Sequence, residues 1–281
     1  MQVLPKVSVR YQCSPGTFTY VSVAKGYKTG GYNVQMFGDL VQEYARYDLM
    51  SKFMPSEAKK PAEVEEVAAY KPEHSWNYEM GIRSELIEDR LHAELTLFYM
   101  DIQDIQLTTL QGEAAYDHQW RQGRQLWGGG KLRSRIAEGL TADLNYGFTR
   151  ATFRDYKTLD KNETEINYKD NFIPYTPRHT VSLGLNYTKL LRNSWFDQFT
   201  VSVQYAGAGK IFWTEKNDIS QDFYGVLNGK VGVRKGIVNL NVWSRNMTDT
   251  DYQAFYFESF DNSFIQKGKP FQIGAEVAVT F

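Results

Sequence analysis

The last eleven residues of the chain alternate between two kinds of side chain. Apolar or aromatic side chains stand at Phe271, Ile273, Ala275, Val277, Val279 and Phe281. The intervening positions are polar or small. Only an extended strand places every second residue on one face, so the segment predicts a β-strand that runs to the last residue. A strand with lipid on one side and a polar interior on the other requires this pattern.

The same alternation recurs along the rest of the chain. It covers residues 7–11, 17–24, 76–86, 91–99, 126–135, 140–149, 180–187, 199–205, 227–233 and 238–242. With the terminal segment, this predicts about eleven strands. In residues 17–24 alone the pattern leaves open which side chains face outward.

The segments between these strands alternate in length. Short turns rich in Gly, Pro, Asn, Asp and Ser occur at residues 13–16, 87–90, 136–139, 192–195 and 234–236. Longer polar segments occupy residues 28–74, 106–120, 155–175, 211–218 and 254–269. Short turns at one rim and long loops at the other are typical of an outer-membrane β-barrel. Within residues 38–70 we expect a short surface helix with Pro61 in its first turn.

Composition narrows the classes of protein that fit. The 281 residues have a formal net charge of −1, which gives no electrostatic indication of nucleic-acid binding. The mean hydropathy is −0.50, and no apolar run reaches the roughly 18 residues of a transmembrane helix. Barrel strands hide apolar residues among polar ones, so these values are compatible with a barrel.

A large soluble β-sandwich or β-helix is the alternative fold, because it would alternate as well. Aromatic residues near strand ends resemble the aromatic girdle of a membrane barrel: Tyr146, Phe148, Tyr187, Tyr252 and Tyr256. The polar faces are rich in Asn, Gln, Thr, Gly, Arg and Glu, as a hydrated interior requires. We therefore predict an all-β protein, an antiparallel transmembrane β-barrel.

Five stretches carry a family resemblance. They are residues 21–33, 70–81, 98–106, 245–252 and 268–270, the last followed directly by the terminal strand. Their sequences, order and spacing resemble the carboxy-terminal half of TonB-dependent outer-membrane receptors, and among these the ferric-siderophore receptors. The likeness covers nearly the whole chain.

The resemblance implies a barrel of about 22 strands that encloses a plug domain. The chain has about half of these strands, no plug, no energy-coupling motif and no signal peptide. We therefore expect residues 1–281 to be one incomplete domain, the carboxy-terminal portion of a longer receptor or one product of a split gene. The implied partners are the amino-terminal barrel half and plug, the inner-membrane TonB complex through that plug, the outer-membrane assembly machinery and the lipid bilayer. The implied location is the bacterial outer membrane.

Import of a scarce chelate, a ferric siderophore, driven by TonB is the implied function. A passive porin-like channel and a non-functional truncated receptor are the alternatives. An outer-membrane enzyme is the weakest reading, because no nucleophile, base and orienting group form a recognisable motif. The sequence predicts no catalytic residues, no metal site and no cofactor, and its four histidines are scattered.

Candidate ligand-binding residues are aromatic and basic residues of the expected loops. They are Tyr32, Phe37, Trp120, Arg121, Trp213 and Tyr256. Packing within the loops is the competing interpretation for each of them.

In the resemblance, Val277, Val279 and Phe281 form the signal read by the assembly machinery, and plain lipid-facing surface explains them equally well. Six charged residues on neighbouring lumen walls are expected to pair with each other or with a plug: Glu79, Arg83, Glu85, Lys131, Arg133 and Arg135. The triplet 128–130 of glycines is expected to thin one strand.

Overall fold

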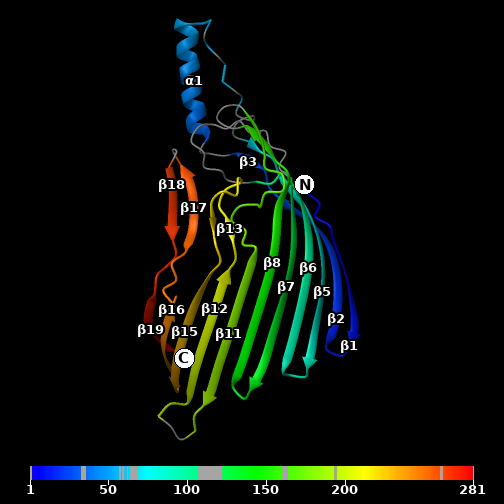
Figure 1. Cartoon of the computed structure of the whole chain (residues 1–281), viewed down its shortest axis with the longest axis vertical. Coiled ribbons are helices and arrows are strands. Elements are labelled where there is room, and N and C mark those ends of the chain that lie inside the picture. Colours follow the sequence, from blue (N-terminus) through cyan, green and yellow to red (C-terminus); the bar gives the residue numbers. More distant parts are fainter. Residues whose placement is uncertain are drawn as a thin grey trace.

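A computed structural model describes most of the chain. It covers residues 2–32, 36–56, 58, 60–61, 63, 69–106, 122–159, 164–192, 195–259 and 262–280, without the side chains of residues 36, 37, 39, 159 and 259. Its main feature is one eleven-stranded sheet in which each strand pairs antiparallel with the next along the sheet (Figure 1). The strands in spatial order are β1 (Lys6–Ser14), β2 (Thr17–Lys28), β5 (Glu73–Ile87), β6 (Leu91–Gln103), β7 (Gln122–Ala137), β8 (Leu140–Asp155), β11 (His179–Leu190), β12 (Gln198–Ala208), β15 (Tyr224–Lys235), β16 (Val238–Arg245) and β19 (Gln272–Val279).

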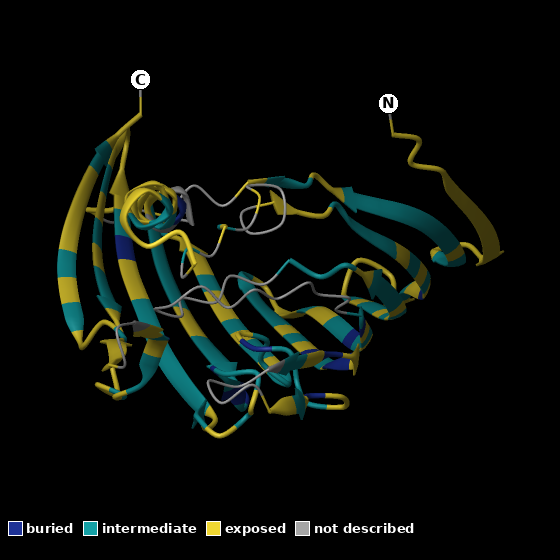
Figure 2. Ribbon diagram, turned by 90° about the horizontal axis from the view of Figure 1, so that it is seen from above, coloured by how far each residue is buried: buried dark blue, intermediate teal, exposed yellow. Residues whose placement is uncertain are grey.

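The sheet confirms the strands predicted from alternation. Seen from above, it curves as an open trough with β1 and β19 at opposite edges (Figure 2). It does not close into a barrel, because β1 and β19 each pair with a single neighbour.

The long connections all lie at one end of the sheet and hold the remaining elements (Figure 1). These are helix α1 (Met36–Phe53) and four hairpins: β3 (Gly31–Tyr32) with β4 (Ala69–Tyr70), β9 (Lys157–Leu159) with β10 (Glu165–Asn167), β13 (Ile211–Phe212) with β14 (Ser220–Gln221), and β17 (Gln253–Ser259) with β18 (Asn262–Lys267). Among the described helices, none is both long enough and apolar enough to cross a bilayer. We call this the loop end of the sheet, and the opposite end the turn end.

The predicted helix is present in the expected segment, but the expected place of Pro61 in it is wrong. The helix begins at Met36 and ends at Phe53, so Pro61 lies beyond it instead of in its first turn. The segment 36–53 contains no proline, and an ion pair between Lys52 and Asp48 at 2.7 Å supports its last turn. Pro55 follows directly and cannot continue the helix, because it has no backbone N–H and disfavours helical geometry in the residue before it.

Cross-strand register gives the sheet one apolar face and one polar face. Directly opposed residues share a face, and Val21, Met80, Leu97 and Gly128 form one such row on β2, β5, β6 and β7. Met80 is 54% exposed and Leu97 is 44% exposed, so no described segment packs against this row of the apolar face. The two buried hydrophobic clusters of the described residues lie at the loop end instead. A soluble sandwich would bury this apolar face, so that alternative does not fit the structure.

The structure also assigns the faces of β2, which the sequence left open. Thr19 and Val21 lie opposite Ile82 and Met80 on the apolar face. Tyr20 therefore lies on the polar face, where its hydroxyl donates to Glu79 Oε1 at 2.7 Å. Its ring occupies the space beside Gly81, where an added Cβ would come within 2.6 Å of it. A glycine on the neighbouring strand thus lets a tyrosine lie flat among polar residues.

Candidate functional site

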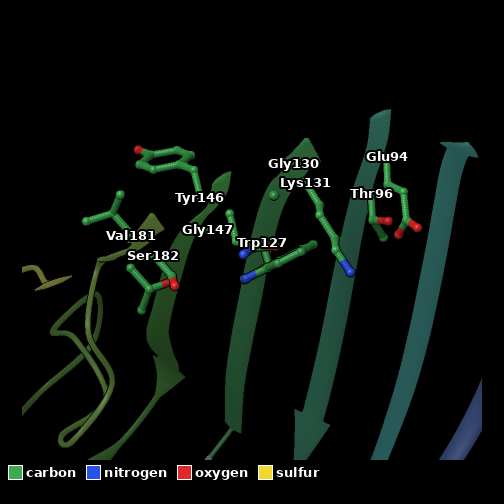
Figure 3. Close-up of a pocket in the computed structure, with 12 residues that line it drawn as sticks. Glu94, Thr96, Trp127, Gly130, Lys131, Tyr146, Gly147, Val181 and Ser182 are labelled. Carbon is green, nitrogen blue, oxygen red and sulfur yellow. The ribbon is translucent and has the colours of Figure 1, made fainter. Parts of the chain in front are cut away.

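A hollow in the polar face lies across β6, β7, β8 and β11 (Figure 3). Its volume is about 280 Å³. The lining includes the polar-face residues Glu94, Thr96, Trp127, Lys131, Asn145, Thr180 and Ser182. We call it the wall hollow.

Trp127 forms the aromatic surface of the wall hollow, and glycines make room for it. A Cβ added to Gly129 would lie 2.4 Å from the indole ring, and one added to Gly147 would lie 3.4 Å from its Nε1. Phe98, the direct partner of Trp127 on β6, stacks on the indole with a centroid separation of 5.1 Å and an interplanar angle of 14°. The space at Gly129 is therefore taken by the indole of Trp127, while Gly128 and Gly130 lie on the apolar face opposite Leu97 and Leu95.

Charged side chains surround the wall hollow on the polar face. Arg83 Nε lies 3.6 Å from Glu94 Oε2, and Arg133 Nε lies 2.7 Å from Asp143 Oδ1. Arg83 and Arg133 are thus paired with Glu94 and Asp143, and not with other members of the predicted set. Lys131 makes no ion pair with any described residue. Its side chain lines the wall hollow together with Trp127 and with Glu94, its cross-strand partner.

Two of the predicted ligand-binding residues come together at the loop end. Trp213 is 5% exposed and Tyr256 is 2% exposed, and both pack with Ile211. The Trp213 indole donates to Gln253 Oε1 at 3.1 Å. The Tyr256 hydroxyl donates to Glu258 Oε1 at 2.6 Å, and burial raises the pKa of this phenol above its ordinary value. These contacts make the pair part of a packed loop cluster.

This burial overturns one interpretation. Tyr256 is not a girdle aromatic, because its ring is enclosed by loop residues. Tyr252 instead stacks on Tyr224, with centroids 4.3 Å apart. By contrast, Tyr146 is 47% exposed and lies opposite Val181 on the apolar face, as a girdle residue should.

The other four predicted ligand residues are not brought together by the described structure. Tyr32 lies in β3 and is 50% exposed. Phe37 lies in α1, and its side chain is outside the described part. Trp120 and Arg121 also lie outside the described residues. Ligand binding by all six residues stays a prediction.

Sequence reasoning did not select Trp127 or Phe98. A usable signal was present, because Trp127 directly precedes Gly128 and shares the parity of Lys131. Alternation therefore places the indole on the polar face, where a large aromatic side chain is unusual. In the terminal strand, Val277 and Val279 are 66% and 46% exposed on the apolar face, while Phe281 lies outside the described residues.

Comparison with known proteins assigns the family. The TonB dependent receptor-like β-barrel family matches residues 1–247. The chain belongs to this family. The pesticin receptor of Yersinia pestis is 23% identical over 100% of this chain and 36% of its own length. The chain thus spans about a third of the length of the curated relatives it matches.

Solved structures agree on the fold. The ferric yersiniabactin uptake receptor from Yersinia pestis superimposes with a TM-score of 0.74 at 22% identity, over 100% of this chain and 37% of that one. The ferric-catecholate import receptor of E. coli K12 gives 0.62 at 17% identity, over 97% of this chain and 34% of that one.

Family membership shows which face of the sheet meets lipid and which lines the barrel interior. The chain is a TonB-dependent receptor barrel portion of the bacterial outer membrane, and its family consists of transport receptors. The apolar face of the sheet therefore meets lipid, and the polar face lines the interior. The wall hollow opens to that interior, and the long connections form the outer rim.

Proposed function

We propose that the chain forms part of an active transporter that imports a ferric siderophore. The wall hollow is the observation that supports this most directly. It combines an aromatic surface at Trp127 with the ammonium group of Lys131, which makes no ion pair with a described residue, while the Glu94 carboxylate in the same lining is paired with Arg83. Ferric chelates are commonly anionic and often bear conjugated rings, which such a pair attracts by stacking and by charge.

The proposal places the wall hollow on the route of the chelate through the barrel. The solved relatives named above include receptors for ferric yersiniabactin and ferric catecholates. A surface that binds weakly suits a route, because a passing ligand must be released again. Stacking on one indole stabilises a ring by about 0.5–1.5 kcal/mol, which is weak enough to allow release.

Energy coupling is the second part of the proposal. We infer that a plug in the same barrel, outside this chain, contacts the inner-membrane TonB complex. There are two alternatives to active import. One is a passive porin-like channel, and the other is a receptor portion that transports nothing. The two transport functions differ in whether uptake needs the inner-membrane proton gradient.

Uptake of radioactive iron into iron-starved cells tests the proposal. The cells carry the intact receptor that contains this chain, and candidate siderophores supply the iron. We expect Trp127→Ala and Lys131→Gln each to slow uptake by about two- to tenfold, by loss of stacking or of the charge. Trp195→Ala is the matched control, because Trp195 lies at the turn end and is 90% exposed.

A protonophore separates the rival functions. Active import predicts that collapse of the proton gradient abolishes uptake, while binding at the cell surface persists. Uptake that survives the protonophore supports a passive channel. Absence of binding and uptake for every chelate tested, with a correctly folded barrel, supports the non-functional alternative.

A further inference from the structure

A second hollow, of about 440 Å³, lies at the loop end of β7 and β8. Its lining is formed by Gln122, Arg124, Arg154, Asp155, Lys169 and Asp170. Arg150 is exposed and lies opposite Leu126, one row nearer the middle of the sheet than Arg124. We call Arg124, Arg150, Arg154 and Lys169 the rim patch.

Register places the arginines of the rim patch on the lipid-facing side of the sheet. Arg124 lies opposite Asp101, which lies opposite Trp76. The ion pair from Arg154 Nη1 to Asp101 Oδ1 at 3.5 Å holds Arg154 on the same side. The position of this patch is independent of the ligand that the receptor transports.

The rim patch shares its level with an aromatic girdle. Arg150 lies opposite Leu126, and the same row continues through Tyr99 to Tyr78. Tyr78 and Tyr99 are 47% and 39% exposed on the apolar face. Exposed aromatic residues of this kind mark the membrane–water interface, so the arginines lie at the height of lipid headgroups.

Carboxylates neutralise the rim patch only in part. Arg124 Nη2 lies 2.7 Å from Asp170 Oδ1, and the two side chains are 45% and 57% exposed. A guanidinium has five N–H donors, so this contact and the one to Thr152 leave several donors free. Arg150 makes no ion pair with any described residue.

The charge count also favours an anionic ligand. Four cations face three carboxylates, those of Asp101, Asp155 and Asp170, which leaves the area positive. At the level of the headgroups an arginine on the lipid-facing side costs little, and an anionic headgroup can accompany it there. Arginine matches the geometry of phosphate through paired hydrogen bonds, and headgroups supply phosphate at this level.

We propose that the rim patch binds the phosphate group of a membrane lipid headgroup at the outer rim of the barrel. The hollow admits the phosphate between Arg124, Arg154 and Lys169, and Arg150 contacts the headgroup from the apolar side. The acyl chains then lie along the aliphatic residues of β6 to β8, such as Leu97.

Native mass spectrometry of the intact protein, purified from outer membranes in mild detergent, tests this. The protein is mixed with phosphatidylglycerol, with diacylglycerol or with inorganic phosphate. We expect several-fold more retained phosphatidylglycerol than diacylglycerol, since only the former has a phosphate. We expect the Arg124→Gln, Arg150→Gln, Arg154→Gln triple variant to lose about fivefold of this retention per arginine, equivalent to about 1 kcal/mol each.

Lys189→Gln is the matched control. Lys189 lies opposite Phe199 at the turn end, on the same lipid-facing side as the rim patch. This variant should retain phosphatidylglycerol as the unaltered protein does, and heat-modified mobility should show that both variants fold. Equal retention of the two lipids, or an equal loss in the Lys189 variant, overturns the proposal. Displacement of phosphatidylglycerol by inorganic phosphate at equal concentration overturns the lipid assignment in favour of a free-anion site.

Discussion

Replacing Val203 with arginine should destabilise the barrel strongly. Val203 lies at the centre of β12, five residues from each end of the strand, and opposite Leu185 and Gly229 on the apolar face. Five residues span about 16 Å at the usual rise of a strand. This distance is too long for an arginine side chain to carry its guanidinium out of the hydrocarbon by snorkelling.

The expected magnitude follows from this position. An arginine on the lipid face of a barrel costs about 2–4 kcal/mol at the bilayer midplane and falls towards zero at the interfaces. At about 1.4 kcal/mol for each factor of ten, the folded fraction relative to the unfolded should fall by about 30- to 700-fold. Gln204→Arg is the matched control, because Gln204 lies on the polar face opposite Gly184 and Asn228, which are uncharged. Its expected cost is near zero.

Urea titration of the intact receptor in phospholipid vesicles measures both variants. Folded barrel is separated from unfolded chain by its heat-modified electrophoretic mobility, and the urea midpoint reports the free energy of unfolding. Equal destabilisation by the two arginines would refute the assignment of faces. A larger effect at position 204 than at position 203 would reverse it.

Three further changes test other parts of the account. Deletion of Phe281 should lower insertion into the outer membrane, and unchanged amounts of heat-modifiable barrel would contradict an assembly signal there. Gly129→Val should displace the indole of Trp127, at a cost of about 1–3 kcal/mol, and weaken chelate uptake while the barrel still folds. Uptake at the unaltered rate would argue against the wall hollow. At the turn end, Asp197 accepts hydrogen bonds from the Gly236 amide at 2.7 Å and from Lys235 at 3.0 Å, which lower the pKa of this carboxyl below its ordinary 3.8. Its stabilisation is therefore complete above that value and disappears as pH falls through the folded pKa, so Asp197→Asn should lower the thermal midpoint at neutral pH but not in strong acid.

The sheet was predictable because lipid imposes a simple rule on every strand. Each membrane strand needs apolar residues at alternate positions, and this pattern survives in the sequence wherever one face meets hydrocarbon. The rule failed for residues 17–24 because two aromatic residues, Phe18 and Tyr20, lie on the polar face, and Tyr20 is sheltered by a glycine of the neighbouring strand. Tyr20 is such a case, and its partner Gly81 lies 61 residues away in the sequence. Alternation within a short segment cannot reveal a contact between residues so far apart in the sequence.

The loop end was less predictable, because its packing depends on contacts between distant segments. Trp213 and Tyr256 are buried in one cluster with Ile211, although the sequence suggests that both are exposed loop aromatics. Helix α1 ends at Phe53, two residues before Pro55, which provides a stop signal, and it does not start at Pro61. The wall hollow was hidden for a different reason. Its lining residues come from four successive strands, and which of them lie side by side depends on the register.

The most direct test of the central claim measures which environment each side chain of β16 meets. Nitroxide labels are placed one at a time at Asn239, Leu240, Asn241 and Val242, in a background with Cys13, the only cysteine, replaced by serine. The account predicts that labels at positions 240 and 242 collide with membrane-dissolved oxygen, and that labels at 239 and 241 collide with a water-soluble nickel chelate. Reversed accessibility, or equal accessibility at all four positions, would contradict a barrel wall with lipid on its apolar face.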